Sequence, residues 1–485
     1  MTLIDGGDLD EENAAGHVHG ICLKTGPPQR VGVELEWLVR DARDPALPVP
    51  AGRIAAAASA FDAARGNPGN ARQNGEKHAR PELPTSSRPG VLPSGALLTT
   101  EPGGQLELSS QPADSLGDLV RATSADLVVL RAELATRGLE LAGIGLDPLR
   151  PPRRVLTLPR YAAMEAFFDA GGPWGRQMMC ATASVQVCLD AGDDSDGPSG
   201  YRQRWRLLHA IGPVLVGAFA NSPLREEKPT GWVSSRQQVW ARMDPGRTRP
   251  PRMNGDPRAA WAAYALDARV MCVPDPDSAD WSAPPGLTFR DWVRGAPAAT
   301  ARMAAARAAA GAAAPANGQA GGGNGRLRRP TADDLEYHLS TLFPPVRPRG
   351  HFELRMIDAQ PGDGWIVPLA VSSALLSDAQ AGDAALTAVA PLWDGRWPGD
   401  DGPWVRAARL GPADPAISRA SRECFAVARQ ALDRMAAPAA ITEAVDAFIG
   451  RYVAKGRCPA DDLLEEAGRH PPLPEQRRFQ SYPSR

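Results

Sequence analysis

A two-residue alternation of apolar and polar side chains marks several β-strands in this chain. Between residues 31 and 39, valine, leucine and tryptophan occupy every second position, and Glu34 and Glu36 lie between them. Successive side chains of a strand point to opposite faces of its sheet, so this segment has one apolar and one acidic face. The same alternation predicts strands over residues 104–110, 181–190 and 351–357, and a short apolar strand is predicted over 139–145.

Longer segments carry the three-to-four-residue spacing of amphipathic helices. The clearest spans residues 116–137 and ends before Gly138, because glycine readily takes the left-handed conformation that closes a helix. Further helices are predicted over 201–220 and 414–449, with shorter ones near 159–169 and 331–342. Strands and helices mix without a regular β–α–β alternation, which indicates an α+β protein with a mostly antiparallel sheet.

Composition narrows the class of protein. The chain has 485 residues, of which 43% are hydrophobic, so it can bury a large core. Its formal net charge is −2, and the sequence has neither a local basic patch nor a nucleic-acid-binding motif. We therefore expect neither nucleic acid nor a membrane as a partner. The longest apolar runs fall far short of the ~20 residues that span a bilayer. The N-terminal residues carry acids where a secretory signal has cations, so we expect a cytoplasmic protein.

Glycine and proline number 48 each, about a fifth of the chain, and they gather in irregular segments. Residues 66–95 are rich in turn formers and residues 308–330 are rich in Ala and Gly, so both are expected to be mobile insertions. Residues 1–25 and 466–485 are expected to be flexible ends. The sequence therefore predicts a single domain over residues 26–465.

The polar faces of the predicted strands are rich in carboxylates. Glu34 and Glu36 lie about 6.6 Å apart at ~3.3 Å per residue, and charges at that spacing repel by roughly 2.5 kcal/mol at an effective dielectric near 20. Glu107, Glu353 and Glu101, which precedes a Pro-Gly-Gly bend, add further carboxylates. Because glutamate is a poor strand former, its recurrence indicates a site for Mg²⁺ and a nucleotide. Ordinary solvent-facing glutamates and a glycosidase-type carboxylate pair stay open as alternatives.

Cationic candidates occur in two places. Arg355 shares a predicted strand face with Glu353, where its guanidinium could bind a phosphate or carboxylate through two N–H groups. Lys228, Arg236 and Trp240 follow a predicted helix in a segment broken by proline and glycine. Arginines on such loops are commonly just solvated, and that interpretation stays open for each of them.

Six sequence blocks occur in the same order as in a known family. They are VGVELEW at 31–37, TEPGGQLELSSQP at 100–112, LAGIGLDP at 141–148, TASVQVCLD at 182–190, FANSPLREEKPTGWVSSRQQVW at 219–240 and HLSTLFPPVRPRGHFELRMIDAQ at 338–360. With these blocks the chain resembles the glutamate–cysteine ligases of the plant-like and bacterial type. Residues 158–180 look most like the branch that starts ergothioneine biosynthesis.

This resemblance implies a glutamine-synthetase-like catalytic domain over residues 26–465, in which a curved, mostly antiparallel sheet forms a funnel and helices pack outside it. It implies ATP-dependent ligation of the γ-carboxylate of L-glutamate to the α-amine of L-cysteine through a γ-glutamyl phosphate, with Mg²⁺ at the phosphates. We therefore expect L-glutamate, L-cysteine and ATP as substrates, and a monomer or weak homo-oligomer. A related ligase with another amine acceptor and a non-catalytic binding member of the fold are the alternatives.

The matching blocks also imply roles for individual residues. The expected metal ligands are Glu34, Glu36, Glu101, Glu107 and Glu353. Arg355 and Glu107 are the expected catalytic residues, and Lys228 and Arg355 are expected to contact the nucleotide. Arg236 is expected to hold a carboxylate of glutamate beside Trp240, with Gln186 and Thr182 also at the substrates. One departure is plain, because plant enzymes have Arg-Thr where this chain has Ala181-Thr182, so one substrate-binding cation is missing.

Overall fold

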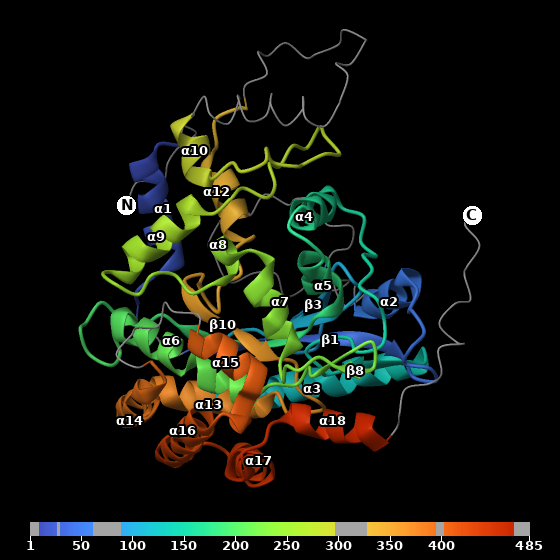
Figure 1. Cartoon of the computed structure of the whole chain (residues 1–485), viewed down its shortest axis with the longest axis vertical. Coiled ribbons are helices and arrows are strands. Elements are labelled where there is room, and N and C mark those ends of the chain that lie inside the picture. Colours follow the sequence, from blue (N-terminus) through green and yellow to red (C-terminus); the bar gives the residue numbers. More distant parts are fainter. Residues whose placement is uncertain (1–8, 27–29, 62–88, 296–326, 394–401, 470–485) are drawn as a thin grey trace, which may run out of the picture.

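An antiparallel sheet of eight strands forms the centre of the computed structural model (Figure 1). The model describes residues 9–26, 30–61, 89–295, 327–393 and 402–469. The strand order is β2-β3-β4-β1-β6-β10-β9, and β5 pairs with the far end of β1. The strands are β1 (Val31–Asp41), β2 (Gly90–Val91), β3 (Leu97–Thr100), β4 (Leu106–Ser109), β5 (Leu139–Ala142), β6 (Ser184–Asp190), β9 (Val346–Pro348) and β10 (His351–Asp358). A separate hairpin joins β7 (Leu224–Arg225) to β8 (Lys228–Pro229).

The register of the sheet brings the predicted polar positions next to one another. Glu36 lies opposite Glu107 on β4, and Glu34 lies opposite Gln186 on β6. The intervening residues Val33, Leu35 and Trp37 are at most 3% exposed and belong to the main hydrophobic core. The alternation read from the sequence therefore describes the two faces of this sheet correctly.

Helices cover the apolar face of the sheet and fill the lower half of Figure 1. Those that contact the sheet are α3 (Leu116–Thr136), α6 (Tyr201–Ala218) and α13 (Ile366–Ser377). Below them in Figure 1 lie α14 (Ala379–Val389), α16 (Pro415–Arg434), α17 (Ala439–Arg451) and α18 (Pro459–Arg469). Helix α15 (Gly402–Leu410) packs against α6 and against α7 (Ser235–Met243). The short 3₁₀ helices are η2 (Ala390–Leu392), η3 (Gly411–Ala413) and η4 (Val453–Lys455). Helices α3 and α6 and the segment of α16 and α17 match the helices predicted from amphipathic spacing, whereas α13, α14, α15 and α18 were not predicted. Gly138 after α3 has φ +64°, as expected for a glycine that closes a helix.

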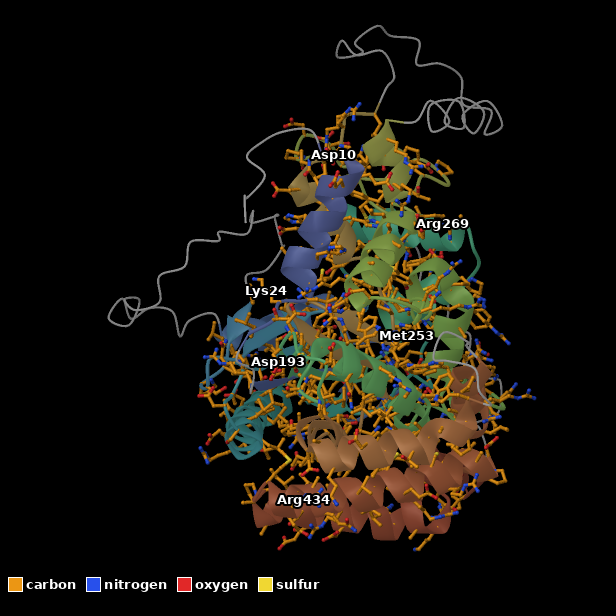
Figure 2. All side chains as sticks on the ribbon, turned by 90° about the vertical axis from the view of Figure 1, so that its left-hand side faces the viewer. Asp10, Lys24, Asp193, Met253, Arg269 and Arg434 are labelled. Atoms are coloured by element: carbon orange, nitrogen blue, oxygen red, sulfur yellow. The ribbon has the colours of Figure 1, made fainter. Side chains whose placement is uncertain are left out.

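A second helical group stands above the other face of the sheet and has its own hydrophobic core. It contains α1 (Glu11–Cys22), α9 (Pro257–Asp267), α10 (Phe289–Arg294) and α12 (Ala332–Leu339). The same side of the sheet also carries α2 (Ala51–Ala58), α5 (Trp174–Ala181), α7 (Ser235–Met243) and α8 (Pro245–Thr248), and α4 (Pro159–Asp169) packs on α5. Figure 2 shows α1 between Asp10 and Lys24 in this upper group, whereas Arg434 marks the lower layer.

Two boundary predictions in the N-terminal part of the chain are wrong. Residues 11–22, expected to be flexible, form α1, because Asp10 caps the helix by accepting a hydrogen bond from the backbone N–H of Asn13 and Ala14, Val18 and Cys22 bury one face. Residues 89–95, assigned to a mobile insertion, contribute β2, which pairs with β3.

The α+β class with an antiparallel sheet is confirmed. The segment 414–449 divides into α16 and α17 at Ala436 (φ +51°) and Pro438. Residues 466–469, expected to belong to a flexible end, form the last part of α18. Residues 66–88 and 308–326 of the expected insertions, and residues 470–485 of the expected end, lie outside the described residues. No helix among the described residues is long and apolar enough to cross a membrane.

Candidate active site

A cavity of about 770 Å³ lies on the acidic face of the sheet, within the size range of small-molecule sites. Four of the five predicted metal ligands line it, namely Glu34, Glu36, Glu101 and Glu107. They come from β1, from β4 and from the turn between β3 and β4. The sheet register accounts for the convergence, because Glu36 and Glu107 are direct cross-strand partners. Side chains of α2, α4, α5 and α7 form the opposite wall.

The electrostatics of this cavity oppose the ionised form of its carboxylates. Burial, followed by the charge of Glu353, raises the pKa of Glu34 to about 7. Burial, followed by Glu36, raises the pKa of Glu101 to about 7. Burial and then the charges of Glu34, Glu101 and Glu36 raise the pKa of Glu107 well above its ordinary value. Like charges crowded in a desolvated space favour binding of a cation.

The carboxylate oxygens of the four cavity glutamates are suitable ligands for Mg²⁺. Carboxylate oxygens are hard ligands, and Mg²⁺ in nucleotide sites is usually held by one or two carboxylates together with phosphate oxygens and water. Among the described residues, no group of three or more His, Cys, Asp or Glu side chains is arranged to hold a metal ion by itself. The four cavity glutamates are therefore candidates to share an ion with a phosphate-bearing substrate.

Glu353, the fifth predicted metal ligand, has a different environment. Its side chain is fully buried and does not line the cavity. Arg347 donates to both of its oxygens at 2.8–3.1 Å, Arg355 donates to Oε1, and Arg349 lies 3.7 Å from Oε2. Although burial opposes ionisation, these arginines hold the pKa of Glu353 well below its ordinary value. In the described structure this carboxylate is the counter-ion of three arginines, and its role as a metal ligand stays a prediction.

A row of arginines faces the cavity from the end of the sheet. Arg355, predicted from the sequence, lines it together with Arg347 and Arg349, which the sequence reasoning missed. The hairpin between β9 and β10 places Arg347 opposite Glu353. The run Arg-Pro-Arg-Gly before a predicted strand was the available signal, since closely spaced arginines near a glutamate-bearing strand favour anion binding.

Arg236 and Trp240 lie on one face of α7 and both line the cavity. The guanidinium carbon of Arg236 lies 4.4 Å from the centre of the Trp240 ring, which is a cation–π geometry. Only 1% of Arg236 is exposed, and its Nε and Nη1 have no hydrogen-bond partner. Buried N–H groups are normally satisfied, so these donors are suited to an anionic ligand.

Gln186 and Thr182, two further predicted substrate residues, also line the cavity. Gln186 donates from Nε2 to Glu36 at 2.8 Å and accepts a hydrogen bond from Arg355, so it links the acidic and the basic sides of the site. The hydroxyl of Thr182 donates to the carbonyl of Met178 at 2.7 Å at the end of α5. Gln186 is thus an organising residue of the cavity.

One predicted cation, Lys228, lies away from the cavity, and one that was not predicted, Arg160, lines it. Lys228 is exposed on the β7–β8 hairpin and is not among the cavity-lining residues, so its predicted nucleotide contact has no support from its position. Arg160, in the first turn of α4, lines the cavity instead. It makes no ion pair with the carboxylates of the described residues, and its Nε has no hydrogen-bond partner. Its guanidinium packs against the ring of Tyr337 at 5.4 Å.

Comparison with known proteins gives consistent matches over nearly the whole chain. The family model described as glutamate-cysteine ligase family 2 matches residues 30–478. A glutamate–cysteine ligase EgtA from Mycolicibacterium smegmatis is 37% identical over 461 residues, which cover 94% of this chain and 91% of the relative. The protein of that name from Mycobacterium tuberculosis is 36% identical, covering 94% and 90%. A solved glutamate–cysteine ligase from Francisella tularensis, in complex with AMP, covers 92% of this chain and 86% of its own, with a TM-score of 0.49 and 12% identity.

Proposed function

The chain belongs to the glutamate–cysteine ligase family, and from this premise we propose that it joins L-glutamate to L-cysteine in an ATP-dependent reaction. ATP phosphorylates the γ-carboxylate of glutamate and leaves as ADP, and the α-amine of cysteine then displaces phosphate from the γ-glutamyl phosphate to give γ-glutamylcysteine. The observation that supports this most is the meeting of four glutamates and several arginines on one cavity. The relatives named EgtA favour ergothioneine biosynthesis as the destination of the product.

Each part of the cavity has a task in this reaction. Arg236, backed by Trp240, binds a carboxylate of glutamate through its unpaired N–H groups. Arg347, Arg349 and Arg355 bind phosphate oxygens and reduce the repulsion between the phosphoryl group and the attacking carboxylate. Because these arginines are fixed by Glu353, they need little reorganisation when the substrates arrive.

The cavity glutamates would hold Mg²⁺ together with the nucleotide. Glu107 is the central one, since it lies opposite Glu36 and its pKa is raised by the charges of three other glutamates. The bound ion supplies charge neutralisation at the phosphates. Gln186 keeps Glu36 and Arg355 in fixed relative positions through its two hydrogen bonds. Thr182 lies on the same wall, next to the position where the plant-type arginine is replaced by Ala181.

Arg160 is our candidate for the cation missing at Ala181. It reaches the cavity from α4 and has no carboxylate partner among the described residues. With Arg236 assigned to glutamate and the three arginines around Glu353 assigned to phosphate, Arg160 is left to bind the carboxylate of cysteine. Met178 and Met179, which line the same wall, fit the apolar thiol-bearing side chain.

The test is ADP formation by the purified chain with ATP, Mg²⁺ and glutamate, supplied with cysteine or with a panel of other amines. We expect turnover that requires both glutamate and cysteine, and mass spectrometry should identify γ-glutamylcysteine. A preference for another amine would support the related ligase in place of the cysteine-specific one. No glutamate-dependent ADP with any amine would refute the proposed function.

A further inference from the structure

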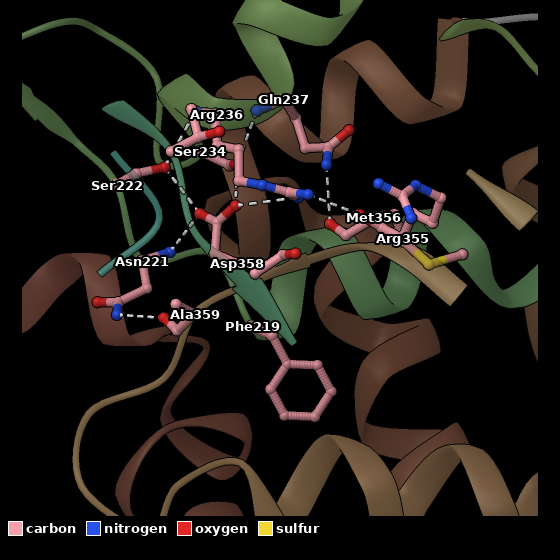
Figure 3. Close-up of polar contacts among 12 residues, drawn as sticks. Phe219, Asn221, Ser222, Ser234, Arg236, Gln237, Arg355, Met356, Asp358 and Ala359 are labelled. Carbon is pink, nitrogen blue, oxygen red and sulfur yellow. Dashed lines mark hydrogen bonds and ion pairs between the residues drawn. The ribbon is translucent and has the colours of Figure 1, made fainter. Parts of the chain in front are cut away.

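Asp358, the last residue of β10, is a buried carboxylate beside the cavity that the reaction above does not use (Figure 3). Only 1% of it is exposed. Its Oδ2 accepts hydrogen bonds from the backbone N–H of Asn221 at 2.9 Å and the hydroxyl of Ser222 at 2.7 Å. Its Oδ1 accepts one from the hydroxyl of Ser234 at 3.0 Å. Three neutral donors therefore fix the orientation of this carboxylate.

The cation nearest to Asp358 is the guanidinium of Arg236, whose Nη1 lies 3.9 Å from Oδ1. This separation is longer than a hydrogen bond. The carboxylate therefore balances the buried positive charge but does not occupy the N–H groups at Nε and Nη1. The remaining nitrogen, Nη2, donates to the backbone carbonyl of Arg355 at 2.9 Å, which fixes the plane of the guanidinium.

The same cluster fastens the backbone of α7 to β10 (Figure 3). The hydroxyl of Ser222, which donates to Asp358, accepts from the backbone N–H of Arg236 at 3.1 Å. Ser234 caps α7 by accepting from the backbone N–H of Gln237, and the Gln237 side chain donates to the carbonyl of Met356 at 2.9 Å. Both the backbone and the charged end of Arg236 are thus held relative to β10.

Because Gly145 has no side chain, the carboxylate of Asp358 can lie directly against its backbone. A Cβ atom on Gly145 would lie 2.5 Å from Cγ and 2.8 Å from Oδ2 of Asp358, which is closer than real contacts allow. This glycine belongs to the block LAGIGLDP, which the reaction leaves unexplained. The space left by its missing side chain holds the Asp358 carboxylate.

We propose that Asp358 is a positioning residue for glutamate binding, which keeps the Arg236 guanidinium charged, oriented and free to donate from Nε and Nη1 to the substrate carboxylate. This inference rests on the proposed function, because it takes glutamate as the ligand of Arg236. Gly145 supports the same arrangement by leaving room for the carboxylate.

The first variant is Asp358→Asn, which removes the charge and keeps the size. Residues that orient the ligands of a metal ion commonly contribute about 10- to 100-fold to affinity, and we expect the same order for a carboxylate that orients Arg236. We expect the Kd of glutamate, measured by isothermal titration calorimetry with Mg²⁺ and a non-hydrolysable ATP analogue, and the KM for glutamate to rise by about that factor. The KM for cysteine and for ATP should stay within about twofold of wild type, since no contact to the arginine row is lost.

The matched control is Asp126→Asn on α3. Asp126 is also fully buried and also accepts hydrogen bonds, from the backbone N–H and hydroxyl of Ser94, but it does not line the cavity. This variant should lower the unfolding midpoint without changing the KM for glutamate. An equal rise in that KM for both variants would reduce Asp358 to a structural residue and overturn the proposal.

Two milder variants decide the question if Asp358→Asn does not fold. Gly145→Ala should push the carboxylate away from its place, and Ser234→Ala removes one of its three donors. Both should raise the KM and Kd for glutamate selectively. If wild type turns over glutamate and these variants bind it as tightly as wild type does, the inference is refuted. If wild type neither binds nor turns over glutamate, the proposed function itself has failed.

Discussion

Replacing Glu353 by glutamine separates two roles that this residue can have. The structure makes it the buried counter-ion of Arg347, Arg349 and Arg355, whereas the sequence reasoning had made it a metal ligand. A metal ligand that is crowded by other carboxylates destabilises the metal-free protein, so its neutralisation is neutral or stabilising. Neutralising a counter-ion instead destabilises the protein, because it leaves buried positive charges without a partner.

The loss of stability expected for Glu353→Gln can be worked out from the distances between Glu353 and its arginines. At an effective dielectric near 20, a carboxylate attracts a cation by roughly 6 kcal/mol at the 2.8 Å separating Glu353 from Arg347, and by roughly 4.5 kcal/mol at the 3.7 Å separating it from Arg349. Desolvation of both partners offsets much of this, and breaking one side of a buried ion pair costs about 3–5 kcal/mol. We expect Glu353→Gln to lower the free energy of unfolding by that amount.

Glu107→Gln is the matched comparison, since Glu107 lies on the same sheet and has its pKa raised by burial and by other glutamates. In EDTA this variant should be as stable as wild type or more stable, while both variants should lose ADP formation. Urea unfolding in EDTA measures the difference through the midpoint at constant slope. The reasoning is refuted if Glu353→Gln is as stable as wild type, or if Glu107→Gln is the less stable of the two.

Three further predictions address other parts of the structure. Arg160→Ala should raise the KM for cysteine by roughly 10- to 100-fold, the equivalent of one charge-assisted hydrogen bond, and steady-state kinetics in which the KM for glutamate rises instead would contradict the assignment. Trp240→Leu should raise the KM for glutamate by roughly threefold to tenfold through loss of a cation–π contact, and an unchanged KM would count against a substrate role. Burial lowers the pKa of His209 to about 4 and that of His338 to about 3, so both are neutral in the folded protein, and the unfolded chain binds more protons below its pKa near 6.5. Stability should therefore be complete above about pH 6.5 and fall by about 1.4 kcal/mol per pH unit and histidine as the pH drops towards 4, and His338→Gln should flatten the fall in unfolding midpoint with pH.

Much of the sheet could be read from the sequence because its two faces differ in polarity. Residues 31–39 gave both the strand and the acidic face, and the register then placed Glu36 opposite Glu107. The Glu353 environment could not be read in this way, because it depends on the β9–β10 hairpin that returns Arg347 to the same carboxylate. A single strand shows which face a residue is on, but it does not show which charges its neighbours bring.

The N-terminal helix was missed for a related reason. The side chains buried by α1 are the small residues Ala14, Val18 and Cys22, which make a weak apolar stripe. Their burial depends on α9, α10 and α12, which come more than 230 residues later in the chain. Arg160 was likewise invisible, because only the packing of α4 beside the sheet brings it to the cavity.

The most direct test that this cavity is the active site is a crystal structure with Mg²⁺, a non-hydrolysable ATP analogue and glutamate bound. The account predicts Mg²⁺ at about 2.1 Å from oxygens of Glu34, Glu36, Glu101 or Glu107, phosphates on the arginines around Glu353, and a glutamate carboxylate on Arg236. Electron density that places the metal and the nucleotide outside this cavity, with the four glutamates bound only to water, would contradict it.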